Sequence, residues 1–322
     1  MSLRIRALGG VLARRGAQSV GVAVLVSVLC FLVVRRLPGD AAYRIAAGRY
    51  GYDLVDEKAA DAVRAELGLD RPAWQQLGGW LGDLFRLDLG RSLVTSRPVV
   101  EEVGYYLLGT LQLAAVALAF ATVLGGAAGV LAARRPGGPV DRLATAWVAG
   151  VRAVPPFLLG LVLVIVLSAQ LGLLPAVGHD SASGIVLPAL TLGIGLSGLV
   201  ARVTRDAVVE VRQSDYVRFA HTKGLAERWV LLRHVVRNAA VVLVPYLGVQ
   251  AVILVEGVVV VESLFAWQGL GHALVHAVFW RDVPVLQAAA LALALLIVTL
   301  NTLVDVAGLW LDPRPRRQEA RA

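Results

Sequence analysis

Three histidines are the residues whose types and spacing come closest to a metal site. His272 and His276 are four positions apart, and His179 lies on another segment. Two histidines at this spacing on a helix can ligate zinc. No third ligand accompanies them at a fixed spacing, so we predict no metal site. Serine, histidine and aspartate all occur, but no G-x-S-x-G elbow does, and we predict no catalytic residue.

Two nucleotide-binding patterns can be checked against their required context. Gly193, Gly195 and Gly198 spell G-x-G-x-x-G. That motif binds a dinucleotide only after a strand, and here it lies in an apolar run, so we interpret these glycines as places where helices pack closely. A phosphate-binding loop needs Gly-Lys-Ser/Thr, and the chain's lysines, Lys58 and Lys223, do not fit it. Any ATP used must therefore bind to another polypeptide, and we predict no cofactor on this chain.

Glu256 is a carboxylate within an apolar run. Such a group is costly in a bilayer unless it is paired or faces water. Three roles are open: lining a transport pathway, pairing with an arginine, or reaching the outer interface. Asn301 and Asp305, four apart on the last apolar run, are predicted to make structural hydrogen bonds.

The composition is that of a polytopic membrane protein. Hydrophobic residues make up 57% of the 322 positions and charged residues only 17%, against about 25% charged in soluble domains. The net charge is +8, but the basic residues sit in clusters between apolar runs, where they set topology. We therefore predict no nucleic-acid partner. The single cysteine, Cys30, excludes an intramolecular disulfide and a cysteine metal cage.

We predict an all-α fold in the cell membrane with six spans and both termini cytoplasmic. Each span has at least the roughly 20 residues that a bilayer core requires. The first is too long for a cleavable signal and is interpreted as a retained anchor. The predicted spans are residues 17–37, 103–133, 144–171, 184–211, 239–261 and 285–310.

The segments between spans carry the expected charge asymmetry. Residues 1–16 and 312–322 are basic and are placed inside. Residues 38–102 have nearly balanced charges and are placed outside, with amphipathic helices over 54–67 and 72–86. Residues 103–311 form the core. A loop over 262–284 is placed outside, with aromatic residues suited to the interface: Trp267, Phe279 and Trp280.

Two glycines and two prolines predict details of the core. Gly125 and Gly129 have the G-x-x-x-G spacing that lets helices approach closely. Pro155 and Pro156 are expected to kink the third span.

A polar, basic stretch lies between the fourth and fifth spans, at residues 213–238. Ser214 and Asp215 suit the start of a short helix. Gly224 suits the left-handed position at its end, and a second helix starts near Ala226. One face of the first helix carries Tyr216, Phe219, Ala220 and Lys223. Two interpretations are open: a docking lever for a soluble partner, or a solvated basic loop kept inside by topology.

With this stretch in place, the chain resembles the permease subunit of a binding-protein-dependent ABC importer of the dipeptide/oligopeptide/nickel branch. The resemblance covers nearly the whole chain, and its specific signal is an EAA-type motif in which Arg218, Phe219 and Ala220 precede Gly224. Other similar segments are RRLPGD, LGLDRP with LDLGRSLVTSRPV, VVVESLFAWQGLG, and the region RDVPVLQAAALALALLIVTLNTLVDVAGLWLDPRPR. Gln268 and Glu256 depart from the branch, which often has proline and glycine there.

The resemblance implies a permease that couples ATP hydrolysis on other subunits to alternating access for a peptide or similar solute. ATP and magnesium would bind two ATPase subunits. A second homologous permease would complete the pore, and an extracytoplasmic binding protein would dock on the external segments. The residues expected to dock the ATPase are Asp215, Tyr216, Arg218, Phe219, Ala220, Lys223 and Gly224. The alternative is an ion-gradient-driven secondary transporter, although no internal repeat supports it.

Overall fold

The computed structural model describes residues 2–68, 71–86, 88–178 and 183–311, so His179 and the tail 312–322 lie outside the described residues. All elements within these ranges are helical, as predicted. The α-helices of the external and first core segments are α1 (Ser2–Arg36), α2 (Ala41–Tyr50), α3 (Glu57–Leu67), α4 (Ala73–Phe85), α5 (Val99–Ala133), α6 (Pro139–Ala153) and α7 (Pro156–Leu163). The later ones are α8 (Val186–Arg212), α9 (Asp215–Thr222), α10 (Glu227–Trp229), α11 (Arg237–Leu264), α12 (Leu270–Trp280) and α13 (Val283–Leu311).

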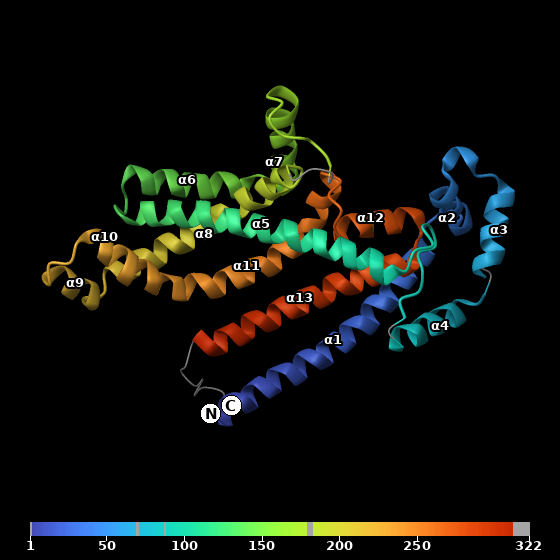
Figure 1. The fold of residues 1–322 in the computed structure, drawn as a ribbon, viewed down its shortest axis with the longest axis horizontal. Coiled ribbons are helices and arrows are strands. Elements are labelled where there is room, and N and C mark those ends of the chain that lie inside the picture. Colours follow the sequence, from blue (N-terminus) through green and yellow to red (C-terminus); the bar gives the residue numbers. More distant parts are fainter. Residues whose placement is uncertain (1, 69–70, 87, 179–182, 312–322) are drawn as a thin grey trace.

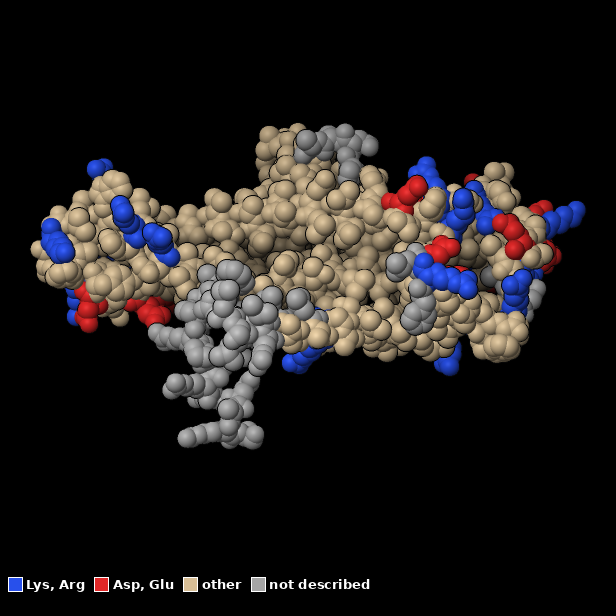
Figure 2. Space-filling view, turned by 60° about the horizontal axis from the view of Figure 1, so that its bottom comes forward, with Lys and Arg blue, Asp and Glu red and all other residues tan. Residues whose placement is uncertain are grey.

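The long helices lie side by side in an elongated bundle, with α9 and α10 at one end and α2 and α3 at the other (Figure 1). Within the described residues, five helices are long and apolar enough to cross a membrane, or six if one bent pair is counted as a single span. Charged side chains gather at the two ends, and a broad, mostly uncharged belt separates them (Figure 2). This is the distribution that a bilayer requires, because charges are costly at its centre.

The third span is broken rather than merely kinked. Pro139–Ala153 and Pro156–Gln170 meet at 101°, at the predicted Pro155–Pro156 pair. Proline removes a backbone donor and clashes with the preceding turn, and two in succession end α6 at Ala153. The second half continues from α7 into a π-helical turn, Val164–Gln170.

The α5–α8 interface is a backbone-to-backbone contact. A Cβ atom added to Gly125 would lie 2.4 Å from the Ser197 carbonyl oxygen, and one added to Gly129 would lie 2.5 Å from that of Ala201. Only glycine allows this approach, so the prediction from the G-x-x-x-G spacing is confirmed.

The G-x-G-x-x-G motif lies inside α8 and follows no strand among the described residues. Gly193 meets Phe120 of α5, where an added Cβ would lie 2.6 Å from its ring, and Gly198 faces Val148 of α6. These two glycines serve helix packing, as interpreted, whereas Gly195 faces open space.

The prediction of a loop over residues 262–284 is wrong in one respect, because this region contains the helix α12. Trp267 is buried rather than interfacial, and its indole Nε1 donates to the Gly109 carbonyl at 2.9 Å. A buried indole finds a partner within the chain, so Trp267 is part of the core.

The region 38–102 contains both predicted helices, as α3 and α4, and also α2, which we did not predict. Two neighbouring residues fasten this region to the bundle. Arg281 donates to the carbonyls of Val34 and Pro38, at 2.9 and 2.7 Å. Asp282 accepts from the Ser92 hydroxyl and from a backbone amide of the same segment.

At the other end of α13, Asn301 and Asp305 make the predicted structural contacts. Asn301 donates to a carbonyl in its own helix, and Asp305 pairs with Arg15 of α1.

Replacing Gly125 with alanine is expected to destabilise the chain by about 1–3 kcal/mol, because the added methyl group forces α5 and α8 apart. Thermal unfolding of the detergent-solubilised protein measures the effect. Gly126→Ala is the matched control, since an added Cβ there meets nothing within 4 Å. Equal stability of the two variants would contradict the close-contact account.

Candidate functional site

The α9–α10 tip, residues 213–238, is a helix, a glycine turn and a second helix, as predicted. Ser214 occupies the N-cap of α9, although its hydroxyl donates to the Val211 carbonyl rather than capping an amide. Gly224 has φ +75°, the left-handed conformation that glycine adopts without strain. The second helix starts after Ala226 and continues through a π-helical turn, Val230–Val236, into α11. The fifth span is therefore the outer part of a helix that begins at the tip.

Two faces of α9 have different environments. Val217 and Ala220 are buried against residues of α8 and of the π-helical turn. Ala220, which we expected to contact a partner, is instead packed between α9 and the rest of the chain. Large apolar side chains elsewhere on the tip are between 44% and 64% exposed: Tyr216 and Phe219 on another face of α9, and Leu225, Trp229 and Leu232 in the segment that follows it. Clustered exposed aromatic and aliphatic side chains are typical of a protein interaction site.

Charged side chains frame this exposed face. The Lys223 ammonium lies 4.6 Å from the centre of the Phe219 ring, a cation–π contact that holds both side chains together. Arg218 and Asp215 are a loose, exposed pair at 3.7 Å. The Glu227 carboxylate pairs with Arg212 Nη2 at 2.9 Å and lies 3.4 Å from His221 Nε2. These contacts link α10 to the end of α8 and to α9. The structure thus brings the predicted docking residues to one tip.

Glu256 lies far from this tip, 19 residues along α11 from Arg237, or about 28 Å of helix. Its side chain is exposed and makes no ion pair within the described part of the chain. The arginine pair that we considered is therefore not formed. Pathway lining and interfacial exposure remain as its predicted roles.

Glu262, six residues further on, is completely buried. Its Oε1 accepts from the Thr110 hydroxyl at 2.7 Å, and its Oε2 accepts from the Gly271 amide at 2.7 Å. A Cβ on Gly269 would lie 2.1 Å from this carboxylate, so glycine is required for the chain to turn around it. Glu262 thereby joins α5, α11 and the start of α12.

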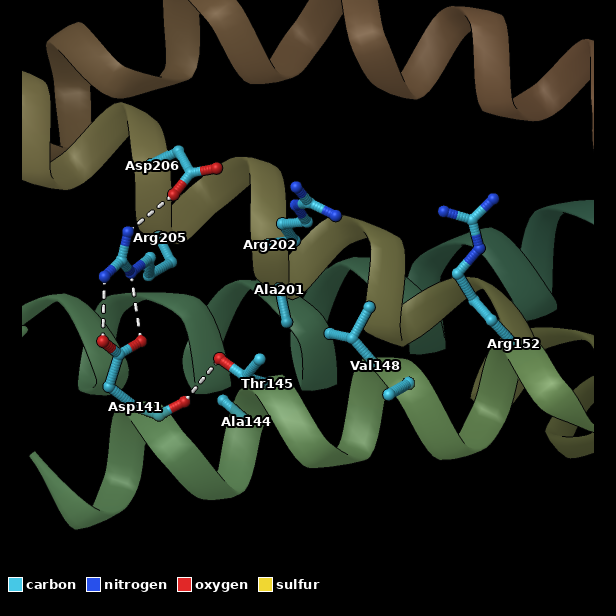
Figure 3. A pocket seen from close by; sticks show the side chains of 10 residues that line it. Asp141, Ala144, Thr145, Val148, Arg152, Ala201, Arg202, Arg205 and Asp206 are labelled. Carbon is cyan, nitrogen blue, oxygen red and sulfur yellow. Dashed lines mark hydrogen bonds and ion pairs between the residues drawn. The ribbon is translucent and has the colours of Figure 1, made fainter. Parts of the chain in front are cut away.

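A cavity of about 410 Å³ lies between α6 and α8. At one end Asp141 accepts two hydrogen bonds from Arg205, from Nε at 3.0 Å and from Nη2 at 2.8 Å (Figure 3). The Gly137 amide also donates to Asp141. Bidentate pairs of this kind fix geometry as well as charge. Two further arginines, Arg152 and Arg202, line the same cavity.

Sequence reasoning missed Asp141, Arg152 and Glu262. Arg152 had a usable signal, because it is a charge inside the predicted third span, and the rule applied to Glu256 applies to it equally. Glu262 was placed in a loop because the fifth span was predicted to end at 261. Asp141 had no signal, since its partner is 64 positions away.

Comparisons with known proteins identify a family and several similar proteins. The family described as binding-protein-dependent transport system inner membrane component matches residues 125–317. A glutathione transport system permease protein, GsiC, of Escherichia coli O6:H1 is 41% identical over 293 residues, which cover 91% of this chain and 94% of the relative. GsiC of Escherichia coli K12 is 40% identical over the same shares. A crystal structure of an amino acid ABC transporter with histidines has a TM-score of 0.49 and 19% identity, covering 65% of this chain and 93% of that chain.

Replacing Glu262 with alanine is expected to destabilise the chain strongly, because the Thr110 hydroxyl and the Gly271 amide lose their acceptor. Each buried group left without a partner costs about 1–3 kcal/mol. Glu256→Ala is the control on the same helix, with an expected change within about 0.5 kcal/mol. Thermal unfolding in detergent measures both, and a Glu262 variant as stable as the control would refute the assigned role.

Proposed function

Because this chain belongs to the family of binding-protein-dependent transport system inner membrane components, and is thus a permease component of an ABC importer, we propose that it forms half of a pathway for a peptide-type solute. Family membership decides against the ion-gradient-driven secondary transporter. The observation that carries the proposal is the exposed apolar face of the α9–α10 tip, at the opposite end of the bundle from α2 and α3 (Figure 1).

The tip couples the permease to a cytoplasmic ATPase subunit. Tyr216 and Phe219 enter an apolar groove on that subunit, and burial of each side chain contributes about 1.5–3 kcal/mol. Arg218 and Lys223 make charge contacts that favour the correct partner and orientation. Gly224 sets the angle at which α9 meets the following helix. ATP and magnesium bind the ATPase subunits, and this chain binds neither.

The continuous helix from Glu227 to Leu264 transmits the motion. When two ATPase subunits close on ATP, they draw the tips of two permeases together. A stiff helix that begins at the tip and ends beside α12 carries that displacement across the bilayer. The pathway then changes between inward-open and outward-open states, as rigid helices repack about an interface.

Two further partners complete the assembly. A second, homologous permease supplies the missing half of the pathway wall. An extracytoplasmic binding protein delivers the solute to the end formed by α2, α3 and α4, which lies outside, with both termini inside. Support for this sidedness comes from the basic clusters on the inner segments.

The proposed cargo is a peptide or a compound built like one. Support comes from the relatives named as glutathione permeases, which match most of this chain. Glu256, exposed in the outer half of α11, lines the pathway in this proposal and interacts with cationic side chains of the cargo.

Phe219→Asp and Gly224→Val are expected to uncouple the complex. The first places a charge in an apolar groove, and the second strains a backbone with φ +75°. ATPase activity stimulated by the loaded binding protein should fall about tenfold or more, whereas Phe219→Leu, which keeps an apolar side chain, should retain most of it. Unchanged stimulation in both damaging variants would remove the coupling role.

Glu256→Gln is expected to slow uptake of cationic peptides by about tenfold and to leave neutral peptides unaffected, because only the former lose a favourable charge contact. Uptake into vesicles containing the whole complex measures this. Intact uptake of both classes would reject a role for Glu256 in binding the cargo.

A further inference from the structure

The cavity between α6 and α8 holds more positive than negative charge. Its lining includes three arginines, Arg152, Arg202 and Arg205, but only two carboxylates, Asp141 and Asp206. Both carboxylates form ion pairs with the same arginine, Arg205. Arg205 makes two hydrogen bonds to Asp141 and donates through Nη1 to Asp206 at 2.8 Å.

Arg152 and Arg202 have no carboxylate partner within the described part of the chain. Both residues are exposed, and both line the cavity. In Figure 3 their guanidinium groups point to the side of the cavity nearer α11, whereas Arg205 turns toward Asp141. A guanidinium without a counter-charge in an apolar bundle is costly unless it meets water or an anion.

Arg152 is exposed but lies far along α6 from the Asp141 end. It is 11 residues from Asp141, about 16 Å of helix, and belongs to the last turn of α6 before the 101° break. The carbonyl end of α6 favours a cation there, and the exposed guanidinium keeps its donors available.

We propose that Arg152 and Arg202 form an oxyanion site that holds a carboxylate of the cargo during its passage toward the cytoplasm. Guanidinium groups bind carboxylates and phosphates through paired hydrogen bonds. The Asp141–Arg205 clamp holds α6 and α8 in register, so the two free guanidinium groups keep their positions. The inference rests on the proposed transport of a peptide-type solute and assigns its carboxylate recognition.

A lipid phosphate has the same chemistry and could come from the inner leaflet, since basic pockets between helices bind headgroups. Depth favours the cargo: headgroup phosphates lie at the interface, whereas Arg152 is about 16 Å of helix further in than the Asp141 end. The break at Pro155 also leaves Arg152 in the last turn of α6 rather than within a continuous helix.

The test uses the assembled complex, with its ATPase subunits and binding protein, in phosphatidylcholine vesicles and with glutathione as the probe. Arg152→Gln and Arg202→Gln are each expected to lower glutathione uptake about tenfold, the effect of losing one charge-assisted contact. Arg152→Lys, which keeps the charge but loses the paired hydrogen bonds, should recover only part of the uptake. The matched control is Arg142→Gln, which removes an exposed arginine of α6 outside the cavity lining.

Three measurements separate the outcomes. Gel filtration confirms that each variant assembles, and if Arg152→Gln does not, Arg202→Gln alone carries the test. Uptake by both glutamine variants equal to that of Arg142→Gln would overturn the inference. So would a loss of uptake that appears only when phosphatidylglycerol is present, because the site would then serve lipid phosphate. Failure of the unaltered complex to import glutathione would instead overturn the proposed cargo.

Discussion

The backbone contact between α5 and α8 is the constraint on which the rest of the structure depends. Without a hydrophobic driving force between helices in lipid, close approach and dispersion have to hold them together, and Gly125 and Gly129 permit that approach. The same pair carries both functional regions. The far ends of α5 and α8 form the base on which the α9–α10 tip packs. Val148 of α6 packs against Gly198 of α8 and sets the width of the arginine-lined cavity.

The charged side chains within the bundle fall into two groups that differ in partners. Asp141 and Glu262 are buried and fully engaged, and each joins elements distant in sequence. Glu256, Arg152 and Arg202 are exposed and have no ion pair in the described part of the chain. The first group is explained by the fold alone. The charges of the second group are costly in a bilayer and no ion pair offsets that cost. We therefore assign these side chains to binding of the transported solute.

Hydropathy, basic clusters and turn residues were sufficient to predict an all-helical chain, the helix–glycine–helix stretch at 213–238 and the close α5–α8 packing. These features depend on local sequence. The burial of Ala220, the hydrogen bonds of Glu262 and the pairing of Asp141 with Arg205 depend on residues far away in the chain. A short apolar helix between two spans is also hard to predict: α12 lies in a region that we predicted as an external loop, and its 11 residues are too few to cross a bilayer.

The central claim, that the α9–α10 tip is the site of contact with an ATPase, is tested most directly by photocrosslinking in the active complex. A photoreactive benzoylphenylalanine in place of Phe219 should crosslink to an ATPase subunit, and the same residue in place of Leu54, also exposed but beside α3, should not. An ATPase crosslink from position 54, or none from position 219 while ATP hydrolysis remains coupled to uptake, would contradict the account.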